Sequence, residues 1–592
     1  MLEHTLRSDF VPGSNLRGEV SGANWLFALP DLRPGTLFCL GTPSLTAAQA
    51  LARRAEHLIV CVPAGVAGAG LPATNTLMCD PQGGLPLATG SADLVMIAGW
   101  EVARRVTRSA AWQAELRRVL SPRGLVYLEA WGVPAPLVGL HEAGRLWLTP
   151  LGGEVHTAVP LEDQLTRQFF VQRRLFTPVL TGQRIKQAIG RGGHTGGSTS
   201  AGEGTEGARA SRGMKQRLSR LVGRVERTLS GLEGHWHRHA ASRGRVGVLF
   251  SAAEGVCLTD PPAYLRNLAA RAGLSLDGYR WGLWAGGQYS SRKVLFYLFE
   301  GAQTAPRYLV KLVRDPAFNP RLENEDRALR QLQTWGFGER HLLPRVAFSG
   351  CADDLFVVGE TVVEGAPFLS RTALTSACPV AQAAVTWLTD LGAQTVTWQP
   401  AQAVAEALQR LFERFQALYN LPDAERDFLA GQIAQLGEAA GEFPLVFQHG
   451  DPGPWNMLVA PDGRVALLDW ESAELQGMPL WDLLYFLRSY ALNVSRGAGI
   501  SARLEGVARH LLDESPLSAW IVGAVRDYCA QIGLGSQYVE PLYYTCWIHR
   551  ALKQATLLPP DHLGQGVYVR LLRHSIDRHD APTLRALFAA GA

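Results

Sequence analysis

A segment that cannot form a hydrophobic core divides this chain of 592 residues. From residue 190 it reads GRGGHTGGSTSAGEGTEGARASRG, in which glycine, serine, threonine and arginine predominate. Such a composition cannot offset the entropy lost on ordering, and the chain is also too long for a single core. We therefore expect a front domain over residues 1–182, a flexible basic linker over 183–245 and a second domain over 246–592.

The second half of the linker carries a helical pattern. Over residues 214–232, leucine and valine recur at helical spacing, and arginines lie largely on the opposite side. A helix of this kind most often docks on a neighbouring domain with its arginines solvated. The alternative is peripheral contact with an anionic membrane surface or an acidic partner.

Charge and cysteine usage narrow the class of protein. The chain has 57 basic and 53 acidic side chains, and a net charge of +4 is too small to indicate nucleic-acid binding. Its eight cysteines are scattered without a CxxC pair, as is typical of buried thiols in a reducing compartment. The first residues lack the pattern of a secretory signal. We expect a cytoplasmic protein.

The front domain alternates short apolar runs with helical patterns. TLFCLG, HLIVCV and ADLVMI are apolar on both faces, which predicts a parallel, Rossmann-like α/β sheet covered by helices. LPLATGSADLVMI and ELRRVLSPRGLVYLEA resemble strands of class I methyltransferases that use S-adenosylmethionine. The resemblance covers roughly residues 35–135.

The resemblance is incomplete where the cofactor would bind. The family places a glycine-rich turn after its first strand, whereas LGTPSLT offers Gly41 alone, with Pro43 beside it. The second strand ends IVCVPAG, without the family's ribose-binding acid, although Asp80 occupies the place of an adenine-binding acid. We expect a degenerate domain that does not use S-adenosylmethionine. The alternative is a bifunctional methyltransferase and kinase.

Two motifs in the second domain contain the residue types that phosphoryl transfer needs. FQHGDPGPWNMLV places Asp451 and Asn456 five positions apart between apolar runs, and VALLDWE ends an apolar run at Asp469. Phosphoryl transfer requires metal ions, positive charge and one carboxylate that orients the attacking hydroxyl. Mg²⁺ prefers oxygen ligands. The sequence predicts Asp451 as the base and Asn456 and Asp469 as Mg²⁺ ligands.

HGDPGPWN, ALLDWE and GMPLWDLLYF together resemble the aminoglycoside phosphotransferase and choline kinase superfamily, small-molecule relatives of protein kinases. The resemblance implies a bilobal fold, with an N-lobe over about 276–362 and a C-lobe over about 363–592. It implies that His449 braces the catalytic loop and that Asp482 anchors the loop backbone.

The implied reaction transfers the γ-phosphoryl group of ATP to a hydroxyl of a small molecule, such as a sugar, amino-sugar or amino alcohol. The alternative is a catalytically silent scaffold with a kinase fold. Such a scaffold need not keep all of Lys311, Asp451, Asn456 and Asp469.

The residues that would hold ATP come earlier in the second domain. Lys311 lies within the apolar run YLVKLV, where a lysine is costly unless it is paired or binds anions. In the next predicted helix Glu325, which shares a face with two leucines, is a better partner for the lysine than Glu323.

Two further segments complete the predicted ATP site. Gly286 and Gly287 could let the backbone approach phosphates, with Ser290 and Ser291 as hydrogen-bond donors. LFVVGETVVEG resembles the strand and hinge that hold adenine by main-chain bonds, which places Glu360 and Val362 at the adenine.

Overall fold

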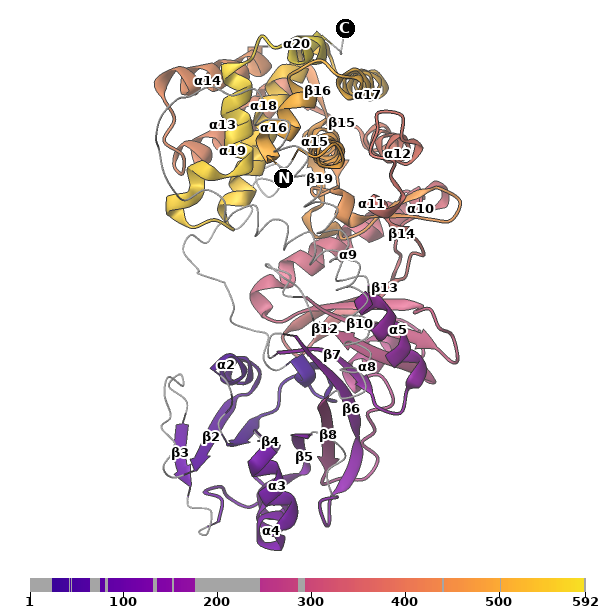
Figure 1. Ribbon diagram of the computed structural model, residues 1–592, viewed down its shortest axis with the longest axis vertical. Helices are drawn as coiled ribbons and strands as arrows, with labels where there is room; N and C mark the ends of the chain where they lie inside the picture. Colours follow the sequence, from indigo (N-terminus) through magenta and orange to yellow (C-terminus); the bar gives the residue numbers. More distant parts are fainter. Residues whose placement is uncertain are drawn as a thin grey trace, which may run out of the picture. The chain divides into compact units, whose positions relative to one another are not determined.

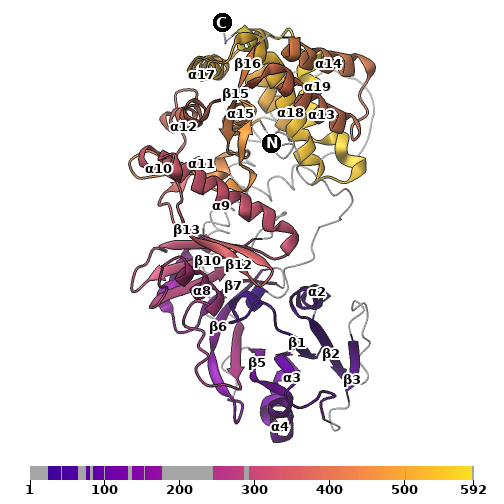
Figure 2. The same cartoon turned by 180° about the vertical axis from the view of Figure 1, so that it is seen from behind.

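The computed structural model is shown in Figure 1 and from behind in Figure 2. It describes the chain except for residues 1–23, 42, 44, 64–74, 80–83, 99, 131–135, 152–153, 176–244, 286–292, 439–440, 501 and 590–592. The predicted linker helix at 214–232 and the glycine–serine loop at 286–291 lie outside the described residues. None of the described helices has the length and apolarity needed to span a bilayer.

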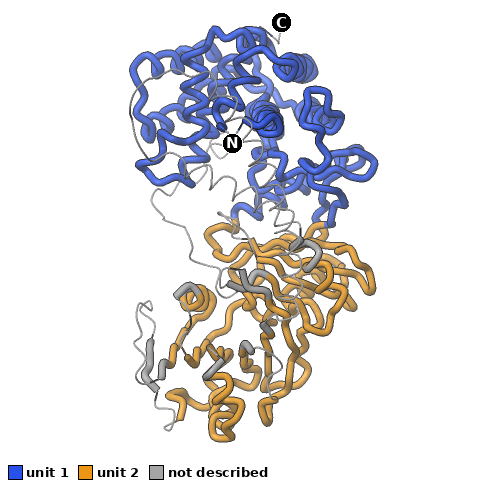
Figure 3. Tube along the Cα trace, viewed as in Figure 1, with its two compact units in different colours: residues 1–15, 320–346, 361–592 blue, residues 16–319, 347–360 orange. Residues whose placement is uncertain are grey.

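The chain forms two compact units (Figure 3). One, which we call the sheet unit, comprises residues 16–319 and 347–360. The other, which we call the helical unit, comprises residues 1–15, 320–346 and 361–592.

The sheet unit is built on one mixed sheet, which has 13 strands among the described residues. Its order is β12-β13-β11-β10-β9-β7-β6-β8-β5-β4-β1-β2-β3. The strands are β1 (Thr36–Leu40), β2 (His57–Pro63), β3 (Asn75–Cys79), β4 (Ala92–Ile97), β5 (Leu120–Ala130), β6 (His141–Leu151), β7 (Glu154–Pro160), β8 (Arg245–Ser251), β9 (Tyr279–Trp284), β10 (Lys293–Glu300), β11 (Tyr308–Val313), β12 (Val346–Ala352) and β13 (Leu355–Thr361). The helices are η1 (Asn24–Ala28), α2 (Leu45–Arg54), α3 (Trp100–Arg108), α4 (Ala110–Val119), α5 (Gln164–Leu175), α8 (Ala263–Arg271) and η2 (Pro316–Phe318).

Strands β1 to β5 are parallel, in the order β3-β2-β1-β4-β5, so the strand order reverses between β1 and β4. Their apolar runs are buried, with Phe38 and Val95 in one core cluster. At the reversal the chain turns through Gly41, whose φ is +111°. A Cβ there would lie 2.3 Å from the carbonyl oxygen of Ala98, so the close approach of the two backbones requires glycine.

Strand β8 lies between β5 and β6, among the strands of the front domain, although it follows the predicted linker in the sequence. It pairs antiparallel with β5, as in Tyr127–Leu249, and with β6, as in Leu146–Gly247. The sequence interpretation placed residues from 246 onward with the second domain. The difference has a physical reason: RVGVLFS buries Val248 and Phe250 in the sheet core, as expected of a central strand.

The pairing of β7 with β9 connects the front part of the sheet to β10 and β11, and β11 carries Lys311. They pair antiparallel through Thr157–Trp284 and Ala158–Leu283. Helix α5 contributes to the same junction, because Phe169 lies against Tyr297 with ring centroids 5.4 Å apart. The front domain and the predicted N-lobe strands therefore share one sheet.

The helical unit contains two small sheets, in the orders β14-β17-β18 and β15-β16-β19, surrounded by helices. Its strands are β14 (Ala366–Pro367), β15 (Thr397–Pro400), β16 (Glu442–Gln448), β17 (Met457–Val459), β18 (Val465–Leu467) and β19 (Glu474–Gly477). The helices are α9 (Asn319–Thr334), α10 (Phe337–Arg340), α11 (Phe368–Arg371), α12 (Pro379–Thr395), α13 (Ala401–Gln416), α14 (Asp423–Glu438), η3 (Pro454–Asn456), η4 (Trp470–Ser472), α15 (Trp481–Gly497), α16 (Arg503–Leu511), α17 (Pro516–Ile532), η5 (Ser536–Tyr538), α18 (Val539–Ala555), η6 (Pro560–Gln565), α19 (Val567–Asp577) and α20 (Pro582–Phe588). One large apolar core unites them.

Candidate active site

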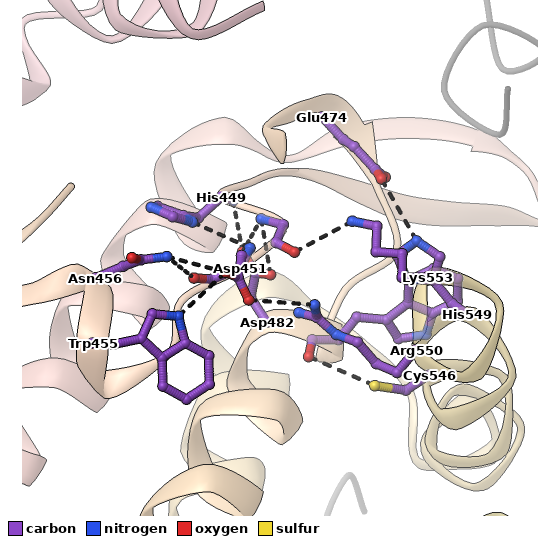
Figure 4. Close-up of polar contacts among 12 residues, drawn as sticks. His449, Asp451, Trp455, Asn456, Glu474, Asp482, Cys546, His549, Arg550 and Lys553 are labelled. Carbon is purple, nitrogen blue, oxygen red and sulfur yellow. Dashed lines mark hydrogen bonds and ion pairs between the residues drawn. The ribbon is translucent and has the colours of Figure 1, made fainter. Parts of the chain in front are cut away.

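The loop between β16 and β17 carries the first motif, and a buried carboxylate on α15 holds its backbone in place (Figure 4). The Asp482 side chain accepts hydrogen bonds from the backbone N–H of His449, at 2.6 Å, and of Gly450, at 3.1 Å. Burial raises the pKa of Asp482, while the nearby His449 and these backbone donors act in the opposite direction. The arrangement matches the anchoring role that the family resemblance implied for Asp482.

His449 connects the two motifs. Its Nδ1 accepts a hydrogen bond from the backbone N–H of Asp451 at 3.2 Å, so the ring proton lies on Nε2. Nε2 then donates to the carbonyl oxygen of Leu468 at 2.9 Å. Leu468 also donates its backbone N–H to the Asn456 carbonyl at 2.8 Å. These bonds fix the residue before Asp469 against the loop.

The two predicted catalytic-loop residues contact each other. Asn456 donates its side-chain amide to the Asp451 carboxylate, at 3.1 Å, and to the Asp451 backbone carbonyl, at 2.9 Å. Both contacts use Nδ2, which leaves Oδ1 as the atom for a metal ion. The indole N–H of Trp455 also points toward Asp451 Oδ2, at 3.4 Å. The Asp451 side chain keeps 35% of its surface exposed, so a substrate hydroxyl can reach it.

The site contains one residue with a strained backbone and one glycine that the close approach of two backbones requires. Asp469 adopts the left-handed conformation, with φ +70° and ψ +68°, directly before η4. Gly450 has φ +77°, and a Cβ there would lie 2.0 Å from the carbonyl oxygen of Ser472. A non-glycine residue in this conformation costs on the order of 1–3 kcal/mol and is typical of functional sites.

Glu325 contacts the segment that follows Asp469. It is fully buried on α9, and its Oε1 accepts a hydrogen bond from the backbone N–H of Trp470 at 3.1 Å. This bond lies within the helical unit. Lys311, its predicted partner, lies on β11 of the sheet unit.

The structure gives Lys311 a carboxylate partner that sequence reasoning missed. The Nζ atom lies 2.6 Å from Oε1 of Glu360, on β13, and both side chains are buried. Glu360 was predicted at the adenine hinge, and here its side chain holds the lysine. Val362 follows the end of β13 and is half-buried. Gly286, Gly287, Ser290 and Ser291 lie outside the described residues.

Two basic residues on α18 complete the surroundings of the loop, and sequence reasoning missed both. Arg550 Nη1 lies 3.7 Å from Asp451 Oδ1, and Lys553 Nζ donates to the Gly450 carbonyl at 3.3 Å. Burial and the neighbouring Arg550 lower the pKa of Lys553. The available signal was the spacing of three between them, which places two cations on one face of a largely buried helix.

Glu474, on β19, adds a carboxylate whose pKa is raised. Its Oε1 lies 3.9 Å from Nε2 of His549. Burial raises the pKa of Glu474 to about 7, against the opposing influence of Lys553. Burial and the two cations beside it hold the pKa of His549 well below its ordinary value, so His549 is neutral.

The oxygen donors of the site suit a hard divalent cation. Asn456 offers an amide oxygen and Asp469 a carboxylate, the ligand types that Mg²⁺ prefers in sites it shares with substrate phosphates. The strained backbone of Asp469 belongs to the same small region. The residues present therefore fit the ion.

The loop, its anchor Asp482 and the oxygen donors Asn456 and Asp469 all lie in a stretch of the chain that matches a known family. Residues 286–516, in the C-terminal half of the chain, match the family model described as the phosphotransferase enzyme family. No curated protein matches the chain.

Solved structures similar to this chain include several small-molecule kinases. An aminoglycoside phosphotransferase from Streptomyces rimosus is 18% identical, over 48% of this chain and 96% of that one, with a TM-score of 0.27. An ethanolamine kinase from Plasmodium vivax is 14% identical, over 53% and 84%, with a TM-score of 0.31. Choline kinase LicA from Streptococcus pneumoniae is 15% identical, over 50% and 92%, with a TM-score of 0.26.

Proposed function

We propose that the C-terminal half is an ATP- and Mg²⁺-dependent phosphotransferase that phosphorylates a hydroxyl group of a small molecule. One observation carries the proposal: Asp451 is held by Asn456 in a loop whose backbone is fixed by the buried Asp482. The match of residues 286–516 to the phosphotransferase family supports it.

Asp451 acts as the base. Its carboxylate orients the acceptor hydroxyl and accepts the hydroxyl proton as the acceptor oxygen bonds to the γ-phosphorus and the bond to the β–γ bridging oxygen breaks. Arg550, whose Nη1 lies 3.7 Å from Asp451 Oδ1, places a positive charge beside the proposed base. His449 fixes the loop geometry through its two ring nitrogens.

Asn456 and Asp469 would hold the metal. When bound, Mg²⁺ offsets the charge of the phosphates and of the transferred group. Lys311 would bind the phosphates, and Glu360, 2.6 Å from its Nζ atom, would orient its ammonium group in a buried strand. The position of Glu325 beside Trp470 supports a role in fixing the Asp469 segment.

The test is ATP consumption by the full chain with a panel of sugars, sugar acids, amino alcohols and aminoglycosides, with Mg²⁺ and with excess chelator. We expect at least one acceptor to raise ADP formation above the rate in its absence, and chelator to abolish the increase. A protein that neither binds ATP nor forms ADP with any acceptor would contradict the proposal.

A further inference from the structure

We infer that the acceptor carries an anionic group, a carboxylate or a phosphate, which Arg488 and Arg550 bind while its hydroxyl reaches Asp451. The inference rests on the proposed function and names the class of acceptor for the same site. It narrows the expected sugars and alcohols to acidic ones.

Two buried guanidinium groups lie on two helices of the helical unit that contact each other. Arg488 is on α15 and Arg550 on α18, and each is 5% exposed. Arg550 lies over the ring of Tyr485, with 3.4 Å from the guanidinium carbon to the ring centroid. Arg488 lies over Tyr568 at 5.1 Å. Aromatic faces hold the planar groups in place without occupying their N–H donors.

The donors of both guanidinium groups are largely unused. Within the part of the chain that the structure describes, Arg488 forms no hydrogen bond or ion pair, and the one ion pair of Arg550 is the contact with Asp451 at 3.7 Å. The Nε atoms of both are buried without a hydrogen-bond partner. Each guanidinium has five N–H donors, and leaving buried donors unsatisfied is costly. An anionic group would satisfy them, because guanidinium binds carboxylate and phosphate oxygens in pairs.

The surrounding charges leave this cluster positive. Its cations are Arg488, Arg550 and Lys553, and the exposed Arg503 acts on Arg488 as a further positive charge. Facing them are Asp451, Asp482 and Glu474. The oxygens of Asp482 already accept hydrogen bonds from the loop backbone, and the pKa of Glu474, raised to about 7 by burial, leaves that group partly protonated at neutral pH.

Arg550 also ties the cluster to the reaction centre. Its guanidinium contacts Asp451 on one side and Tyr485 on the other, and Tyr485 lies 6.2 Å from Tyr568, the ring under Arg488. An acceptor whose hydroxyl meets Asp451 therefore places its neighbouring substituent among these groups. An ammonium substituent would be repelled there, whereas an anion relieves the repulsion between the two arginines.

Two matched series of probes test the inference with the full chain. The first is glucose, glucuronate, glucose 6-phosphate and glucosamine; the second is glycerol, glycerate, glycerol 3-phosphate and 3-aminopropane-1,2-diol. Within each series the hydroxyl framework is kept while the charge changes. Binding by calorimetry and ADP formation are measured for the wild type, for Arg488→Gln and Arg488→Lys, and for the control Arg526→Gln, which alters an exposed arginine on α17.

We expect an anionic member of a series to bind at least tenfold more tightly than its neutral and cationic counterparts. Arg488→Gln should weaken that binding at least tenfold, Arg488→Lys should restore part of it, and Arg526→Gln should leave it unchanged. The carboxylate and phosphate members separate the two sources of the anion.

Failure of the inference is distinct from failure of the proposed function. ADP formation that prefers neutral or cationic members, or probe binding without charge preference, overturns the inference while the phosphotransferase stands. Anion binding that depends on Arg488, with no ADP formation by any acceptor, supports the anion site and contradicts the phosphotransferase. An unchanged affinity in Arg488→Gln also overturns the inference.

Discussion

The side-chain amide of Asn456 donates a hydrogen bond to the carboxylate of Asp451, with 3.1 Å between Nδ2 and Oδ2. The bond orients the predicted base. Because it uses Nδ2, it leaves Oδ1 of the same amide available to bind the proposed Mg²⁺. Asn456 thus links the proposed base to the proposed metal site.

Asn456→Ala tests this double role. Loss of the amide oxygen removes one metal ligand, so we expect the Mg²⁺ concentration for half-maximal activity to rise at least tenfold, together with a fall in the maximal rate. Magnesium titrations of turnover measure both. Asn493→Ala, which alters an asparagine bonded only within α15, is the control and should leave the titration unchanged. A normal Mg²⁺ requirement in Asn456→Ala would assign the metal to other ligands.

Substitutions in the pair of Lys311 and Glu360 should change the unfolding free energy and the KM for ATP independently. Lys311→Met removes the cation beside the buried carboxylate of Glu360, which should cost about 3–5 kcal/mol of unfolding free energy. Adding Glu360→Gln should recover most of that stability, but the KM for ATP should stay raised in the double variant. Denaturant unfolding and ATP titrations check the two halves. Unchanged ATP affinity in the double variant would show that this strand does not bind the phosphates.

Glu474 predicts a pH dependence of stability. Its pKa of about 7 lies above the ordinary value of 4.5, so the folded state holds a proton that the unfolded state releases between these values. The unfolding free energy should therefore fall as pH rises through this window, by up to about 3 kcal/mol, and level off above pH 7. Glu474→Gln should remove this fall.

Unfolding at pH 5 and pH 8 measures the effect. Glu442→Gln, which alters an exposed glutamate of the same small sheet, is the control. Equal pH dependence in Glu474→Gln and the wild type would mean that Glu474 titrates near its ordinary value.

The front sheet predicts an absence of S-adenosylmethionine binding. The strand order reverses beside Gly41, whose backbone packs directly on Ala98, and the glycine-rich turn and the ribose-binding acid of the methyltransferases are absent from the sequence. We expect calorimetry to find no binding tighter than about 1 mM, or about −4 kcal/mol. The full chain is the right sample, since residues 1–182 lack β8, the strand that lies between β5 and β6 and pairs with both. A micromolar isotherm would favour the bifunctional protein.

The sequence predicted the parts of the molecule that depend on local patterns. The apolar runs became parallel strands in the front sheet, and HGDPGPWN placed Asp451 and Asn456 in contact, because a short loop between two strands restricts where its side chains can lie.

Long-range pairing could not be predicted in the same way. The insertion of β8 between β5 and β6 depends on which sheet edges are available, and RVGVLFS is equally apolar whichever sheet it joins. Arg488 and Arg550 lie on helices far along the chain from Asp451. Periodicity indicates that such helices form, but it does not specify which helices pack beside the loop.

The most direct test of the phosphotransferase is the turnover of Asp451→Asn with a responsive acceptor. The substitution keeps the size of the side chain and removes the base, so activity should fall at least about 100-fold while the thermal midpoint and ATP affinity stay close to those of the wild type. Asp462→Asn, which alters an exposed aspartate bonded to Arg464 after β17, should retain full activity. Near-normal turnover in a folded Asp451→Asn protein would contradict the mechanism.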